Sequence, residues 1–272
     1  MRVRFLGVRG STPAPGTDFA RYGGHTSCVA VSHDGSDEPS LILDAGTGIR
    51  SVSALLAGPA FSGSVLLTHL HWDHLQGLPF FTKGDQPGAD VDVYLPSQEG
   101  MSGRDLLARF LSPPYFPIIP EGLQGSWRFH AIQPGVVHTA GFEVSAFDVE
   151  HKGGRTFGYR VSDESGSLAY LPDHSAVSRP SSLVQLIRGV DVLIHDSQFL
   201  DTEREVAGRF GHATVGDSIE LATEAGAGQL VHFHHSPVRT DSQLDAVREL
   251  ARGPMETHVA REGMTLVLGG SG

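Results

Sequence analysis

The sequence predicts an α/β protein in which two mixed β-sheets pack face to face and helices cover their outer sides. Stretches rich in strand-forming residues recur along the chain, with helical patterns among them, and both halves show the same style. The 272 residues include 34 glycines and 16 prolines, which indicates many turns and therefore many short elements. No low-complexity linker or short repeat divides the chain, so we expect one domain covering residues 1–272.

The first half of the chain mixes strand and helix signals. Residues 2–8 alternate as in a strand and precede a turn that contains Gly and Pro. Residues 48–58 repeat apolar side chains at a spacing near 3.6 and stop at Gly58, which predicts a helix. Another helix is expected at 103–111, and one starts within 73–81 before a proline-marked bend. The other strands predicted here cover 27–33, 40–46, 64–68 and 91–96.

The second half repeats this style with a longer series of strands. The helices predicted there cover 180–188, 214–226 and 240–252. The strands predicted there cover 127–132, 142–149, 156–162, 167–171, 190–195, 229–233 and 264–268. Residues 112–122 cannot be regular structure, because four prolines interrupt them.

Charge and cysteine content narrow the class of protein. The formal net charge of −11 repels polyanions, so an extended nucleic-acid groove is not expected. The single cysteine, Cys28, cannot form an internal disulfide or a cysteine-based zinc framework. No signal peptide and no membrane-spanning run of apolar residues is recognisable. These features predict a soluble, cytoplasmic protein without a membrane partner.

The strongest functional signal follows the predicted strand 64–68, in the stretch SVLLTHLHWDH. His69 and His71 alternate along the strand direction and therefore point the same way. Asp73 and His74 come at a loop-to-helix start, where their side chains can turn back toward the same point. Nitrogen and carboxylate ligands suit Zn(II), Mn(II) or Fe(II). Taken alone, this cluster can fill most of one metal site or supply half of two adjacent sites.

The stretch THLHWDH resembles the signature of the metallo-β-lactamase fold hydrolases. Four further matches occur in the order of that family, in LILDAG, FDVEHKGG, LAYLPDHS and GQLVHFHHSP; they are Asp44, His151, Asp173 and His234. The segments GVRGSTPAPG and GHATVGDSIELATEAG make the resemblance closest to the ribonuclease Z-like phosphodiesterases. The resemblance implies a four-layer αββα sandwich and a metal-dependent hydrolase.

The resemblance further implies two divalent metal ions per chain, with zinc expected and manganese or iron as alternatives. One ion would be held by His69, His71 and His151, and the other by Asp73, His74 and His234. Asp173 would bridge them, although the familiar Gly-Asp-Thr is Leu-Pro-Asp-His here. Two such ions polarise a shared water, so a metal-bridging hydroxide would be the nucleophile. The carboxylate Asp73, as part of this centre, counts as a catalytic residue.

Other histidines compete for some of these roles. His138 rivals His151, but it lies in GVVHTAG, which indicates a hairpin turn. His232 shares a strand face with His234 and is expected in the core or behind the ligands, while His235 is a candidate for the pocket wall. The roles of five histidines stay open on sequence grounds: His25, His174, His195, His232 and His235. Three others, His33, His130 and His258, are expected at the surface or in the core.

His212 is the second predicted catalytic residue. It precedes Thr214, which can cap the helix predicted from 214, and a helix N-terminus favours anions. The resemblance implies that His212 binds the scissile phosphate or protonates the leaving oxygen, for which an imidazole is suited. Asp44 is expected to support the ligand loop by hydrogen bonds rather than to bind metal, and Asp196 is expected to act similarly.

A small phosphodiester, such as a cyclic nucleotide, is the expected substrate. In the tRNA-processing relatives a long tRNA-clamping arm separates the third ligand histidine from the bridging aspartate, whereas here 151 and 173 are 22 positions apart. An RNA nuclease, a hydrolase of another ester and a non-catalytic nucleotide-binding protein are the alternatives. The segment 112–122 is a candidate lid, dimer contact or plain loop, and the resemblance weakly favours a homodimer.

Overall fold

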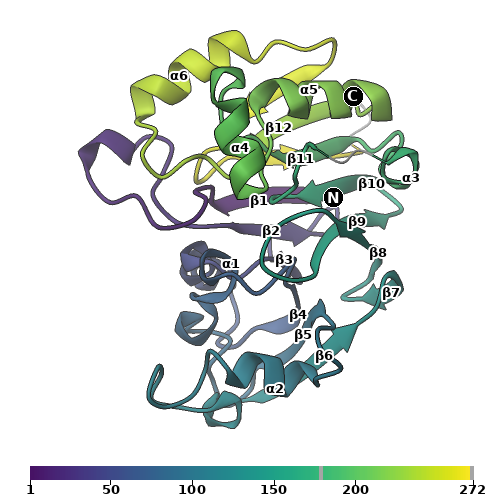
Figure 1. Ribbon diagram of the computed structural model, residues 1–272. Helices are drawn as coiled ribbons and strands as arrows, with labels where there is room; N and C mark the ends of the chain where they lie inside the picture. The colour runs from purple at the N-terminus through teal and green to yellow at the C-terminus, as the bar shows by residue number, and fades with distance from the viewer. Residues whose placement is uncertain (178–179, 270–272) are drawn as a thin grey trace.

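The computed structural model describes residues 1–177 and 180–269, which form two seven-stranded sheets packed face to face (Figure 1). The first sheet has the order β14-β1-β2-β3-β4-β5-β6, with bounds Thr265–Val267, Arg2–Gly7, Cys28–Ser32, Leu41–Leu43, Ser62–Leu66, Asp90–Pro96 and Ser126–Ile132. The second has the order β13-β12-β11-β10-β9-β8-β7, with bounds Glu256–Val259, Gln229–Phe233, Val192–Asp196, Gly166–Leu171, Thr156–Asp163, Phe142–Val149 and Gly135–Thr139. The predicted pair of mixed sheets is therefore confirmed.

The helices cover the outer faces of both sheets. The α-helices α1 to α6 span Trp72–Leu75, Gly103–Ala108, Ser181–Leu186, Arg204–Phe210, Val215–Ala225 and Asp241–Leu250. The 3-10 helices η1 to η5 span Thr17–Phe19, Thr47–Leu55, Leu78–Phe80, Pro120–Gly122 and Asp201–Glu203. Figure 1 shows α1 and α2 beside the first sheet and α4, α5 and α6 beside the second. Within the described residues, no helix has the length and apolar character needed to cross a membrane.

Alternate side chains of a strand enter different hydrophobic cores: the central core between the sheets, or the outer core between a sheet and its helices. In β2, Val29 and Val31 enter the core between the sheets, while Ala30 faces the outer core under η2 and α2. In β11, Ile194 likewise enters the central core and Leu193 packs under α3 and α5. Strands such as β2 and β11 are thus buried on both faces, which explains the apolar runs in their sequences.

The structure corrects several of the expected elements. The helix expected at 48–58 is the 3-10 helix η2, Thr47–Leu55, rather than an α-helix, because the apolar Ile49, Val52 and Leu55 recur every three residues. The segment around His138, expected to be a turn, is the edge strand β7. Strand β13 and helix α4 were not expected from the pattern. The helix expected within 73–81 is divided between α1 and η3.

The fold gathers the polar ends of several strands at one edge. Strands β3 and β4 run parallel, as do β10, β11 and β12. Strand β8 pairs antiparallel with β9, which pairs antiparallel with β10, so β8 runs in the same direction as β10. The carboxyl ends of these strands are where open α/β sheets bind ligands. All of the predicted metal ligands follow such ends.

Candidate metal centre

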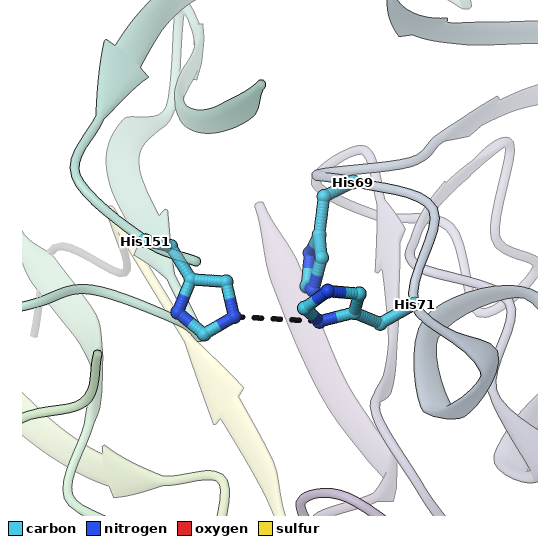
Figure 2. Close-up of side chains that lie close together, drawn as sticks. All are labelled: His69, His71 and His151. Atoms are coloured by element: carbon cyan, nitrogen blue, oxygen red, sulfur yellow. Dashed lines mark hydrogen bonds between the residues drawn. The ribbon is translucent and has the colours of Figure 1, made fainter. Parts of the chain in front are cut away.

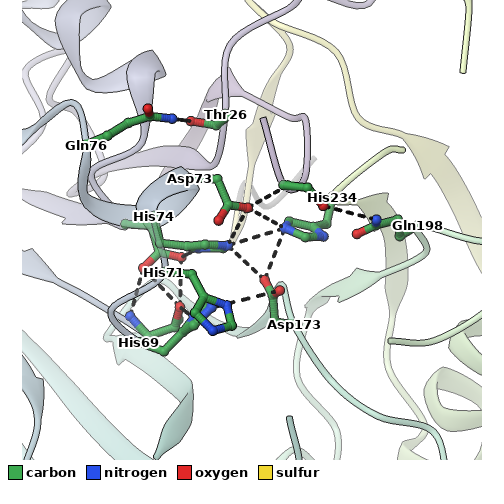
Figure 3. A network of polar contacts seen from close by, with 12 residues as sticks. Thr26, His69, His71, Asp73, His74, Gln76, Asp173, Gln198 and His234 are labelled. Carbon is green, nitrogen blue, oxygen red and sulfur yellow. Dashed lines mark hydrogen bonds and ion pairs between the residues drawn. The ribbon is translucent and has the colours of Figure 1, made fainter. Parts of the chain in front are cut away.

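Three of the predicted ligands form an almost regular triangle of donor atoms. The Nε2 atoms of His74 and His234 lie 3.2 Å apart, and each lies 3.2 Å from Oδ2 of Asp73 (Figure 3). A tetrahedral zinc ion with bonds of about 2.0 Å has ligand atoms about 3.3 Å apart. All three residues are buried. The spacing and chemistry of these atoms therefore fit one metal ion.

Asp173 presents its two carboxylate oxygens to different groups of ligands. Its Oδ2 lies 2.9 Å from Nε2 of His74 and 3.2 Å from Nε2 of His234. Its Oδ1 lies 3.5 Å from Nε2 of His151 and 4.0 Å from Nε2 of His69. The carboxylate thus stands between two clusters of donors, which is the arrangement that a bridging ligand requires.

We call His69, His71 and His151 the first group of ligands, and Asp73, His74 and His234 the second group. The rings of the first group gather edge to face (Figure 2). Nε2 of His151 lies 3.4 Å from Nδ1 of His71. Nε2 of His69 is buried without a hydrogen-bond partner. A buried nitrogen left without a partner is costly, so a cation at this point would satisfy it.

The hydrogen bonds behind the ligands orient three of the rings. Nδ1 of His74 donates to Asp44, 2.7 Å away, and Nδ1 of His151 donates to the carbonyl oxygen of Gly211, also 2.7 Å away. The hydroxyl of Thr68 donates to Asp44 and so accepts from Nδ1 of His69 at 3.1 Å. In each neutral ring the Nε2 lone pair then faces the centre, as metal ligation requires.

The protonation states of the first group favour metal binding. Burial lowers the pKa of His69, His71 and His151 below that of a free imidazole. These rings are therefore neutral at neutral pH. Neutral imidazoles offer the lone pairs that a divalent ion needs.

The second group concentrates negative charge. Burial alone would raise the pKa of Asp73 and Asp173, but the neighbouring His74 and His234 hold both pKa values well below the usual carboxyl range. Burial would lower the pKa of His74, yet the charges of Asp73, Asp173 and Asp44 outweigh it and raise that pKa well above its ordinary value. The protein alone thus attracts a proton to the position where a metal ion would bind.

Asp44 connects the ligand loop to the central core. It is fully buried and accepts from the backbone N–H of Thr68 at 2.7 Å, from Nδ1 of His74 at 2.7 Å and from the hydroxyl of Tyr170 at 2.9 Å. Its own backbone has a positive φ of 58°, which turns the chain after β3. The expectation that Asp44 supports the loop by hydrogen bonds agrees with this geometry.

Replacing Asp44 with asparagine is expected to weaken metal binding about 10- to 100-fold, the usual effect of losing a hydrogen-bond partner behind a ligand. The amide nitrogen cannot accept from donors such as His74 or Thr68. Metal affinity is measured by competition with a chromogenic chelator. Tyr170→Phe is the control, since it removes one donor and keeps the carboxylate; a loss as large in this variant as in Asp44→Asn would contradict the assignment.

His212 lies beside both ligand groups. Its Nδ1 donates to Oδ2 of Asp196 at 2.7 Å and lies 3.8 Å from Oδ1 of Asp173. Burial would lower the pKa of His212, but the charge and hydrogen bond of Asp196 outweigh it and raise the pKa to about 9. Thr214 caps α5, as the sequence predicts, by accepting from the N–H of Asp217 at 3.2 Å. The cap already uses one of the first N–H groups of α5. His212, rather than this helix start, therefore lines the cavity over the centre.

The remaining histidines are occupied elsewhere. His232 does not share a face with His234 as expected, because His234 has a positive φ of 59° and leaves the strand; Nδ1 of His232 meets the hydroxyl of Ser197 at 2.9 Å. His235 pairs with the carbonyl of Ala260 rather than lining the pocket. His174 and His195 contact each other, and His25 contacts Thr47. The three expected surface or core histidines, His33, His130 and His258, pair with Asp163, Asp92 and Gln229.

A cavity of about 640 Å³ opens onto the centre. The ligands that reach its wall are His71, Asp73, His151, Asp173 and His234, and His212 joins them. Sequence reasoning missed other lining residues, among them Ser11, Lys152, Gln198 and Phe210. Ser11, with a positive φ of 64°, donates its backbone N–H to Oδ2 of Asp73 at 2.6 Å. The Gly-containing loop after the first strand is a sequence feature that could have indicated Ser11 as a site residue. No sequence feature indicates Gln198.

Comparisons with known proteins agree with this geometry. The family model described as the β-lactamase superfamily domain matches residues 40–235. Ribonuclease Z of Natronomonas pharaonis is 25% identical over 290 residues, which cover 87% of this chain and 87% of that protein.

Solved structures share the fold over almost the whole chain. The metallo-β-lactamase fold protein YhfI from Bacillus subtilis has a TM-score of 0.74 at 18% identity, covering 98% of this chain and 99% of that one. A diphosphatase from the PhnP family has a TM-score of 0.74 at 21% identity, covering 98% and 97%. Zinc-bound PqqB from Methylobacterium extorquens has a TM-score of 0.70 at 22% identity, covering 98% and 100%. The chain thus belongs to the β-lactamase superfamily, as a metal-dependent hydrolase with the metallo-β-lactamase fold that resembles ribonuclease Z.

Proposed function

We propose that the protein is a binuclear metal-dependent phosphodiesterase acting on a small phosphodiester, with zinc as the metal. The observation that carries this proposal is the position of Asp173, whose two oxygens face separate groups of ligands. When bound, two such ions supply a water of lowered pKa as nucleophile and neutralise charge on the phosphoryl oxygens. Both effects accelerate the hydrolysis of a phosphodiester.

The residues of the chain would hold the two ions and position the ligands. The three histidines of the first group, His69, His71 and His151, would hold one ion. Asp73, His74 and His234 would hold the other, and Asp173 would contact both. The backbone N–H of Ser11 keeps the carboxylate of Asp73 in place from the N-terminal loop. Most of these donors are buried, so the local dielectric is low and the electrostatic interactions among them are stronger than in water.

His212 is the proposed acid for the leaving oxygen. Its Nδ1 proton is held by Asp196, so its Nε2 proton is the one available for transfer. With both nitrogens protonated, the ring is an imidazolium that lines the cavity, and its Nδ1 lies 3.8 Å from Oδ1 of Asp173. An acid placed there can protonate the alkoxide as the phosphorus–oxygen bond breaks.

A small substrate is favoured over a structured RNA. Between His151 and Asp173 the chain forms only the hairpin of β9 and β10, which leaves no room for an arm that grips tRNA. The net charge of −11 opposes binding of a long polyanion. Cleavage of an RNA precursor is the second candidate, because relatives in the comparison are ribonucleases Z.

Metal content and turnover test the proposal together. Wild type and Asp73→Ala would be assayed on bis(p-nitrophenyl) phosphate and on 2′,3′- and 3′,5′-cyclic nucleotides. About two metal ions per chain, with turnover lost in the variant, are expected. Two ions without diester turnover would contradict the phosphodiesterase, and less than one ion after reconstitution would contradict the ligand set. Efficient, strongly salt-dependent cleavage of RNA would favour the second candidate.

Replacing His212 with alanine is expected to lower kcat about 10²- to 10⁴-fold, because a general acid contributes that much. The metal content should not change, since this side chain is not among the proposed ligands. The effect should be smaller with p-nitrophenyl esters, whose leaving group needs no proton, than with cyclic nucleotides. His138→Ala, an exposed histidine on β7, is the control. An equal loss with both kinds of ester would contradict the role as acid.

A further inference from the structure

A second cavity, of about 870 Å³, lies directly beside the one over the metal centre. The two cavities share Leu70, His71, Trp72 and Gly153 as lining residues. A molecule whose phosphate rests at the metal centre can therefore extend past His71 into the second cavity. None of the roles proposed above uses this space.

Five aromatic side chains line the second cavity: Trp72, Phe80, Phe110, Tyr115 and Phe116. Its floor includes Leu75 and Leu106, which belong to the outer core of the first sheet. Above this floor, the rings of Phe80 and Phe116 meet edge to face with centroids 5.9 Å apart. At the rim, Trp72 is 74% exposed and Tyr115 is 81% exposed. Large aromatic side chains gathered in one exposed place mark a binding surface.

The charges around the second cavity are balanced. Among its lining residues in the described part of the chain, the formal charges belong to Glu99 and Arg109, which pair with each other at 2.9 Å. The cavity over the metal centre differs, because Lys152 and His212 line it beside the carboxylates of the proposed ligands Asp73 and Asp173. A second phosphate is thus poorly suited to the aromatic cavity, whereas an uncharged planar ring can stack on its walls.

From the proposed function and this geometry, we infer that the second cavity binds an aromatic ring carried by the substrate, so that the phosphodiester is one with a nucleobase or aryl group close to its phosphate. Trp72 and Tyr115 are the specificity-determining residues. Trp72 is well placed for this role, because it stands between the ligands His71 and Asp73 in the chain and lines both cavities.

A matched pair of substrates tests this inference on the zinc-loaded protein. Ethylene phosphate has the five-membered cyclic phosphodiester of 2′,3′-cyclic AMP but no ring to stack. Wild type is expected to prefer the nucleotide by about tenfold or more in kcat/KM, and Tyr115→Ala should reduce that preference about five- to tenfold by removing a stacking face. Tyr115→Phe should keep the preference. Val136→Ala, an exposed apolar residue on β7, is the unrelated control.

Binding is measured separately from turnover. The chain has two tryptophans, so in Trp127→Phe the fluorescence reports Trp72 alone. Adenosine 5′-monophosphate should quench this fluorescence, and ribose 5-phosphate should not. Failure of wild type to hydrolyse either cyclic phosphate, together with quenching by the nucleotide, would overturn the proposed function and leave the aromatic site standing.

Four results would overturn the inference itself. The first is an equal kcat/KM for both cyclic phosphates in wild type, and the second is an unchanged preference in Tyr115→Ala. The third is a dimer in sedimentation that Tyr115→Ala converts to a monomer, because the exposed ring would then be a contact with a second copy of the chain. Quenching of Trp72 by ribose 5-phosphate as strong as that by the nucleotide would argue against ring recognition in the same way.

Discussion

Turnover of bis(p-nitrophenyl) phosphate is expected to fall about a thousandfold when Asp173 is replaced by alanine. No other carboxylate among the proposed ligands faces both groups of donors. Without it, the repulsion between two divalent ions is no longer reduced by a shared negative charge, so we expect about one ion per chain instead of two. The measurement is kcat together with metal content by plasma mass spectrometry.

The control for this variant is Asp34→Ala, which removes an exposed carboxylate from the loop after β2. It should leave both quantities unchanged. Full metal content and nearly normal turnover in Asp173→Ala would show that the carboxylate does not bridge. An unfolded variant is recognised by its circular dichroism spectrum, and Asp173→Asn, which keeps the volume and removes the charge, would then be measured instead.

A loss of about 3 kcal/mol in the free energy of unfolding is expected for Gly77→Ala. A β-carbon on Gly77 would lie 2.1 Å from the carbonyl oxygen of Gly46 and 2.8 Å from Cγ2 of Ile49. Backbone bonds fix this approach, because the N–H of Gly77 donates to Ala45 and the N–H of Ala45 donates to His74. The ligand loop must therefore move away from Gly46 and the start of η2, which also weakens metal binding.

Thermal unfolding of the metal-free protein measures this effect, and its midpoint should fall by several degrees. The matched control is Gly88→Ala, where the added β-carbon would meet only Cβ of Ala60 at an ordinary 3.7 Å. Its midpoint should stay close to that of wild type. Equal midpoints for both variants would mean that the approach of Gly77 to Gly46 does not limit stability.

Much of the fold was predictable because the central strands are buried on both faces. Strand β11, for example, begins with the apolar run Val-Leu-Ile, since Leu193 and Ile194 serve different cores. The missed elements lie where burial is slight. In α4 Ala207 is the one residue buried, so no apolar stripe reveals the helix. Strand β13 is a short edge strand in which Val259 alone is buried.

The candidate site was predictable where its residues are adjacent in sequence, and less so where it depends on tertiary contacts. The spacing of His69, His71, Asp73 and His74 already indicates a shared target. The hydrogen bond from His212 to Asp196 and the position of Gln198 arise only when β11 meets the loop before α5. The face of His234 was mistaken, because a positive φ interrupts the alternation of its strand.

Anomalous X-ray diffraction from crystals grown with zinc tests the central claim most directly. The account predicts two peaks per chain, both next to Asp173. One should lie among His69, His71 and His151, and the other among Asp73, His74 and His234. A single peak, or two peaks that do not share Asp173, would contradict a binuclear centre bridged by this carboxylate.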